Sequence, residues 1–185
     1  MQELSLHVLD IAENSVAANA SLITISVCIN SKTKMLSVEI TDNGKGMGEE
    51  TVKKATDPFY TSRTTRRVGL GLSFLKQLAE LTDGQFSLSS VLGKGTVVMA
   101  YFTLGHVNLL PLGDMAATIT TLVQSNPNID FVYTIMADDD CFTVDTRELR
   151  SILGDVSLAE PQVAVFLREY VCEHTNHIQN RSIGI

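Results

Sequence analysis

The chain has 185 residues, of which 44% are hydrophobic and 19% are charged, a composition typical of a folded globular protein rather than a disordered one. Its formal net charge of −7 disfavours broad binding to nucleic acids or to anionic membranes. No apolar stretch reaches the roughly 18 residues that a membrane span requires. Three cysteines without a CxxC motif, and a start without a charged-then-apolar signal sequence, predict a cytoplasmic protein.

The first half of the chain alternates between helical and strand-like patterns. Apolar spacing predicts a helix over the first twenty residues, with Asp10 and Asn14 on its polar stripe. Strand parity at the end of the second predicted strand places Asp42 on the buried face. The expected elements are a helix over 1–20, strands over 23–29 and 36–40, a short helix over 49–55, a loop over 57–68, a helix over 69–81 with Gly84 at its C′ position, and strands over 85–90 and 96–103.

A change in composition around Pro111 predicts a boundary between residues 1–104 and residues 105–185. Beyond it, Asp114 is expected to cap a helix that runs to about residue 123. A hairpin over 129–144 is expected to turn at Asp138-Asp139-Asp140, which fits a solvated hairpin tip better than a cation site.

Two further helices are expected near the end of the chain. Asp145 is expected to cap the first, and Ser157 the second, through a capping box with Glu160. The apolar side chains of the second helix, over about 158–172, predict a core or a homodimer face. The Cys172-x-His174-x-x-His177 spacing has no second cluster of metal ligands elsewhere, so a metal site is the weaker interpretation.

These elements predict an α+β fold in two layers, with an antiparallel-rich sheet and helices on one face. The chain is therefore expected to contain a two-layer α/β sandwich over residues 1–104. Residues 105–185 are expected to form a small α+β interaction module.

Several segments carry side chains suited to binding a nucleoside triphosphate. An amide and a carboxylate one helical turn apart can bind a hard cation such as Mg²⁺. Glycines permit close backbone approach, and free N–H groups at a helix start attract phosphate. Each segment alone also fits an ordinary solvated helix face, turn or loop. The segments are Asp10 with Asn14, Asp42-x-Gly44-x-Gly46, the loop Asp57-Pro58-Phe59-Tyr60-Thr61-Ser62 with Arg63, Arg66 and Arg67, Gly69-Leu70-Gly71-Leu72, and Gly93-Lys94-Gly95-Thr96.

In this order and spacing, the segments resemble the GHKL ATPases, the Bergerat-fold group that includes gyrase, MutL and the sensor histidine kinases. The resemblance covers roughly residues 1–104, and the Pro58-Phe59-Tyr60-Thr61 string points to the histidine-kinase branch. It implies binding of ATP with Mg²⁺. The implied site residues are Asn14 as the Mg²⁺ ligand, Asp42 as the adenine-binding aspartate, Gly44 and Gly46 beside the base, Phe59 as the F-box aromatic, Thr61, Arg63, Arg66 and Arg67 near the phosphates, Gly69, Leu70, Gly71 and Leu72 in the G2 box, and Thr96 in the adenine network.

The sequence departs from the family pattern at two places. Asp10 stands where kinases commonly carry asparagine and where MutL-like ATPases carry a catalytic glutamate, so Asp10 is a candidate general base. Arg67-Val68 precedes Gly69 where kinases often have Gly-Thr, which implies a short and basic phosphate lid.

The resemblance leaves three functions open. The first is transfer of the ATP γ-phosphoryl group to a partner protein. This reading expects the acceptor on another protein, because the ATPase pattern starts almost at Met1, and it expects His7 to be a partly exposed helix residue. The second is an ATP-hydrolysing conformational switch, and the third is a non-catalytic, anti-sigma-like nucleotide-dependent binding module. Phosphoryl transfer ranks slightly ahead of the other two.

Overall fold

The computed structural model describes residues 3–55 and 70–182 of the chain. The strands are β1 (Leu22–Asn30), β2 (Met35–Asp42), β3 (Gln85–Val91), β4 (Gly95–Thr103), β5 (Asp130–Ala137) and β6 (Asp140–Asp145). The helices are α1 (Leu4–Ala17), α2 (Glu49–Ala55), α3 (Leu70–Leu81), α4 (Met115–Ser125), α5 (Thr146–Leu153) and α6 (Pro161–Ser182). Each element matches a predicted one, with boundary shifts at several ends.

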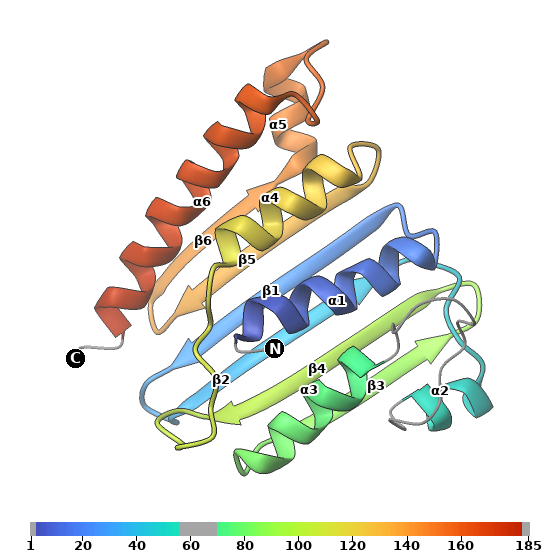
Figure 1. Cartoon of the computed structure of the whole chain (residues 1–185), viewed down its shortest axis with the longest axis vertical. Helices are drawn as coiled ribbons and strands as arrows, with labels where there is room; N and C mark the ends of the chain where they lie inside the picture. Colours follow the sequence, from blue (N-terminus) through green and yellow to red (C-terminus); the bar gives the residue numbers. More distant parts are fainter. Residues whose placement is uncertain (1–2, 56–69, 183–185) are drawn as a thin grey trace.

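The six strands form one sheet in the order β3-β4-β2-β1-β5-β6. The pair β1 and β5 is parallel, and the other neighbouring strands pair antiparallel. Helices α1, α3, α4 and α6 lie side by side on one face of the sheet (Figure 1). The predicted two-layer α/β arrangement is therefore confirmed.

Buried apolar residues alternate with half-buried residues along the strands, and the buried ones form the core between the sheet and the helices. In β1, the side chains of Ile23, Ile25, Val27 and Ile29 are at most 3% exposed, whereas the residues between them are half-buried. Burial of each such side chain contributes about 1.5–3 kcal/mol, so this pattern fixes which face of the sheet the helices cover. A one-residue slip would turn the whole set toward solvent.

The second half of the chain extends the same sheet. Strand β5 pairs in parallel with β1, from Leu22 opposite Asp130 to Ile29 opposite Ala137, and β6 then forms the outer edge. The boundary predicted after residue 104 falls in the connection between β4 and α4. The residues on both sides of this boundary share one sheet and one hydrophobic core. The division into two domains remains a prediction.

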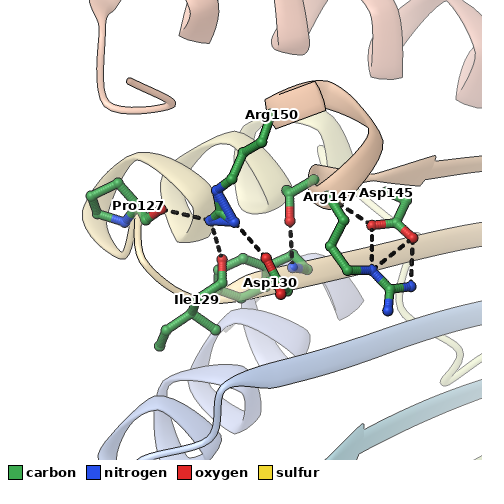
Figure 2. Close-up of polar contacts among 8 residues, drawn as sticks. Pro127, Ile129, Asp130, Asp145, Arg147 and Arg150 are labelled. Atoms are coloured by element: carbon green, nitrogen blue, oxygen red, sulfur yellow. Dashed lines mark hydrogen bonds and ion pairs between the residues drawn. The ribbon is translucent and has the colours of Figure 1, made fainter. Parts of the chain in front are cut away.

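Helix α5 is attached to the sheet by polar contacts from two arginines (Figure 2). The Arg150 guanidinium donates to the carbonyl oxygens of Pro127, at 2.6 Å, and Ile129, at 2.9 Å, and pairs with the Asp130 carboxylate. At the helix start, Asp145 Oδ1 accepts from the backbone N–H of Arg147 at 2.9 Å, which confirms the predicted cap.

Two predicted helix ends differ in the structure. Helix α6 begins at Pro161, where a fixed φ suits the first helical turn, so the expected capping box of Ser157 and Glu160 is wrong. At the end of α3, Asp83 adopts the left-handed conformation (φ 54°) in place of Gly84. Gly84 is needed for a different reason, because a β-carbon there would lie 1.8 Å from the carbonyl oxygen of Tyr101.

In the part of the chain that the structure describes, no helix combines the length and apolar character that crossing a membrane requires. Cys28, Cys141 and Cys172 are all unpaired. Within the same residues, no group of three His, Cys, Asp or Glu side chains is arranged to hold a metal ion. The structure therefore gives no support to a metal site at Cys172, His174 and His177 or to a cation site at Asp138, Asp139 and Asp140.

Candidate functional site

The Asp42 carboxylate occupies the end of β2, beneath the last turn of α1. It is 8% exposed, as strand parity predicts. The Ser15 hydroxyl donates to its Oδ2 at 2.6 Å, and the backbone N–H of Gly44 donates to its Oδ1 at 2.8 Å. A buried carboxylate needs such partners, and these two fix its orientation while leaving further lone pairs to accept from a ligand.

The glycines that follow Asp42 lie very close to the protein's own backbone. A β-carbon on Gly44 would lie 2.8 Å from the carbonyl oxygen of Ala18. One on Gly46, where φ is 64°, would lie 2.0 Å from the carbonyl oxygen of Val91. These contacts join the loop after β2 to the end of α1 and to the β3–β4 hairpin. That the glycines also line a base remains a prediction.

Thr96 lies directly opposite Asp42 in the β2–β4 register. Its hydroxyl is 2.9 Å from Ser90 Oγ, which also receives the backbone N–H of Met47 at 2.8 Å and donates to the carbonyl oxygen of Gly95 at 2.9 Å. Ser90 has one proton and directs it to Gly95, so the Thr96 hydroxyl donates to Ser90. The remaining lone pairs of Thr96 are then acceptors beside Asp42.

Asp10 and Asn14 lie one turn apart on α1, both partly exposed, as the polar stripe predicts. Gly71, in the first turn of α3, is packed against Asp10, and a β-carbon there would lie 2.0 Å from Asp10 Oδ2. The start of a twelve-residue helix thus lies beside this carboxylate, at the end where free N–H groups favour anions. Leu72 is half-buried against the core, and Leu70 is the first residue of α3.

Six of the residues predicted for the site lie outside the described residues: Phe59, Thr61, Arg63, Arg66, Arg67 and Gly69. Of the others, Gly44 donates its backbone N–H to the Asp42 carboxylate, Thr96 lies opposite Asp42 in the strand register, and Gly71 is packed against Asp10. Two contributors were missed by sequence reasoning, Ser15 and Ser90. Ser15 follows Asn14 on the core side of α1, a position that periodicity could have shown; Ser90 carries no local signal, because its role depends on the strand register.

His7 also differs from its expectation. It is 5% exposed and, among the residues that the structure describes, its Nδ1 atom has no hydrogen-bond partner, although it belongs to the polar stripe of α1. Burial lowers the pKa of this imidazole, because the charged form loses its hydration. The expectation of a partly exposed histidine is therefore wrong, and its burial disfavours the charged form of the ring.

The chain belongs to the family described as histidine kinase-, DNA gyrase B- and HSP90-like ATPases, whose match covers residues 2–106. The predicted resemblance to the GHKL superfamily is thereby confirmed. The family match ends close to the boundary predicted from composition.

Curated relatives include sensor histidine kinases from Bacillus subtilis. The chain is 33% identical to YvrG over 93 residues, which cover 48% of this chain and 16% of the relative. It is 32% identical to WalK over 89 residues, which cover 45% of this chain and 14% of the relative. The chain thus matches about one sixth of the length of these relatives.

A solved structure with a similar fold covers more of this chain than the family match does. The N-terminal domain of a DNA repair protein is 19% identical, with a TM-score of 0.50, over 78% of this chain and 52% of that one. The Aquifex aeolicus MutL ATPase domain complexed with ADP is 14% identical, with a TM-score of 0.47, over 83% of this chain and 69% of that one. The first of these includes residues of the second half within the shared fold.

Proposed function

We propose that this protein binds Mg-ATP and regulates a partner protein by transferring the γ-phosphoryl group to it. Its ATPase family and its histidine-kinase relatives support nucleotide binding and phosphoryl chemistry. The partner is a protein rather than a nucleic acid, since the net charge of −7 would repel phosphates outside a dedicated pocket. Unpaired cysteines fit a cytoplasmic location.

The observation that carries this proposal is the Asp42 carboxylate, held by Ser15 and Gly44 and facing Thr96. A fixed acceptor in a buried position suits an amino group such as the exocyclic amine of adenine. In this proposal Gly44 and Gly46 approach the base, and the start of α3 with Gly71 receives the phosphates.

The residues beside the phosphate end fit a magnesium ion held mainly by its nucleotide. Mg²⁺ prefers oxygen ligands and usually takes only one or two from the protein, the rest coming from phosphates and water. Asn14 would supply an amide oxygen, and Asp10 offers a carboxylate one turn earlier. A bound ion would neutralise charge on the phosphates, and Asn14 and Asp10 would hold it through their side-chain oxygens, directly or through water.

Isothermal titration with Mg-ATP tests nucleotide binding. Asp42→Asn has nearly the same shape but replaces one carboxylate oxygen with an amide donor, so we expect ATP affinity to fall at least about tenfold. The matched control is Asp83→Asn, because the Asp83 side chain is 85% exposed. Full affinity in Asp42→Asn would overturn the assignment.

Transfer is tested by incubating the protein with γ-³²P-ATP in an extract of its own cells. Labelling of a second protein that disappears with Asn14→Ala is the expected result. Labelling that survives this substitution would contradict the proposal.

The contact between Asp10 and Gly71 favours a second candidate, an ATP-hydrolysing switch. A carboxylate next to the phosphate-binding helix start is placed to accept a proton from an attacking water. Steady phosphate release without partner, lost in Asp10→Asn, would support hydrolysis. If ATP binds and neither transfer nor release occurs, the third candidate applies, a nucleotide-dependent binding module.

A further inference from the structure

The outward face of α6 carries exposed apolar and acidic side chains together. Val165 is 58% and Phe166 56% exposed, although both are large hydrophobic residues on a well-formed helix. Glu169 and Glu173 are also exposed and lie three and seven positions after Phe166, which places them on the same helical face. Aromatic side chains are enriched in protein–protein interfaces relative to the rest of the surface.

The Phe166 ring is held in place by a series of ring contacts. It stacks on Tyr170, with centroids 5.7 Å apart and planes at 9°. Tyr170 in turn contacts His174 at 4.5 Å and Phe142 of β6 at 5.3 Å. Because Phe142 is only 7% exposed, the series connects an exposed ring to the core. A ring fixed in this way loses little conformational entropy when a partner binds it.

The charge of the protein is concentrated in the same half of the chain. Residues 105–185 contain eleven Asp and Glu, four Arg and no Lys, which accounts for the whole net charge of −7. The arginines at 147, 150 and 168 are each paired with an aspartate. Over the described part of this half, Glu169 and Glu173 have no ion-pair partner within 4.0 Å. The face of α6 is therefore both aromatic and negatively charged.

We infer that this face of α6 binds an arginine-bearing basic segment of a partner protein. A guanidinium group can stack on the Phe166 ring and pair with the carboxylate of Glu169, and a second basic side chain can pair with Glu173 one turn further along α6. A nucleic acid or an anionic membrane would be repelled by the carboxylates. A second copy would present the same acidic face and be repelled too.

The position of the face separates it from the nucleotide site. Helix α6 covers the β6 edge of the sheet, whereas α2 and α3 lie toward the β3 edge (Figure 1). Binding to α6 can therefore be measured without ATP, and its failure would not affect the proposed nucleotide chemistry.

The test uses three fluorescein-labelled synthetic peptides of one amphipathic helical pattern, with leucine on one face and arginine, lysine or glutamate on the other. Fluorescence anisotropy with the full chain should show saturable one-to-one binding of the arginine peptide. The lysine peptide should bind about threefold to tenfold more weakly, because an ammonium group cannot stack or pair bidentately. The glutamate peptide should not bind. Raising the salt concentration from 0.05 to 0.5 M should weaken binding further.

Two variants of α6 locate the site, each with a matched control. Phe166→Ala and the double change Glu169→Gln with Glu173→Gln should each weaken the arginine peptide about fivefold or more. Phe74→Ala removes another exposed ring, and Glu49→Gln with Glu50→Gln removes the same charge elsewhere. Equal losses in variants and controls, equal affinity for arginine and lysine peptides, or a dimer that dissociates with Phe166→Ala would overturn the inference.

Discussion

Asp10 of α1 and Gly71 of α3 are in contact although they lie 61 positions apart in the chain. A β-carbon on Gly71 would lie 2.0 Å from the Asp10 carboxylate oxygen Oδ2 and 2.9 Å from Asp10 Cγ. Asp10 stands where kinases commonly carry asparagine, and the contact places its carboxylate beside the start of α3. It also means that the size of residue 71 controls where that carboxylate can be.

Gly71→Ala should displace the Asp10 carboxylate, since a side-chain end moves more easily than backbone. Alanine is a better helix former than glycine, so thermal stability should be kept or slightly raised. If Asp10 acts as a base, single-turnover ATP hydrolysis should fall about tenfold or more. The control is Gly48→Ala, whose β-carbon would meet Leu92 Cδ1 at an ordinary 3.7 Å. An unchanged rate would exclude Asp10 as a base whose position depends on the size of residue 71.

Ser90→Ala should weaken ATP binding through its effect on Thr96. The change removes the hydrogen-bond acceptor of the Thr96 hydroxyl and of the Met47 N–H. One such bond is worth about 0.5–1.5 kcal/mol, so we expect the ATP dissociation constant to rise about twofold to tenfold by calorimetry. Ser89→Ala is the matched control, because Ser89 is the exposed neighbour on the same strand. Equal effects of the two changes would remove Ser90 from the site.

His7 should make the protein less stable as the pH falls. Its pKa is lowered in the folded state by burial, so the unfolded chain takes up the proton first. Stability is therefore complete above the unfolded pKa of about 6.5 and is lost as the pH falls below it. Urea unfolding at pH 7.5 and 5.5 should show a smaller difference for His7→Leu than for the wild type. His177→Leu, at an exposed position, should leave the difference unchanged.

Arg150→Lys should destabilise the protein by about 1–2 kcal/mol in urea unfolding. Lysine keeps the charge, but its ammonium group cannot at the same time donate to the carbonyl oxygens of Pro127 and Ile129 and pair with the Asp130 carboxylate, as the Arg150 guanidinium does (Figure 2). Arg147→Lys is the control, because that side chain is 54% exposed and its ion pair with Asp145 is local. Its effect should stay below about 0.5 kcal/mol. Similar losses in both variants would contradict a specific role for Arg150.

Tyr133 and Thr175 bring two hydroxyls into the core between β5 and α6. Burial raises the pKa of Tyr133 to about 12, and the nearby Thr175 hydroxyl acts to lower it, yet within the described part of the chain neither hydroxyl makes a hydrogen bond of normal geometry. Replacing both with apolar groups of the same shape should leave the free energy of unfolding unchanged or raise it by about 1 kcal/mol. A loss above about 2 kcal/mol for Tyr133→Phe with Thr175→Val would show that the two hydroxyls are well paired.

The sequence by itself determined the elements and the direction of several side chains. Alternation in β1 and β2 follows from the period of two in a strand, and it placed Asp42 on the buried face before any contact was known. Caps at Asp114 and Asp145 are equally local, because a cap involves only the next two or three residues. Signals of this kind need no knowledge of distant residues.

Only the tertiary structure decided which distant residues meet. The parallel pairing of β1 with β5, the register that places Thr96 opposite Asp42, and the contact of Asp10 with Gly71 join positions far apart in the chain. His7 shows the same limit: helical periodicity put it on a polar stripe, but α1 packs against both α3 and α4, so part of that stripe is buried. A local period describes one element alone, and burial depends on what packs against it.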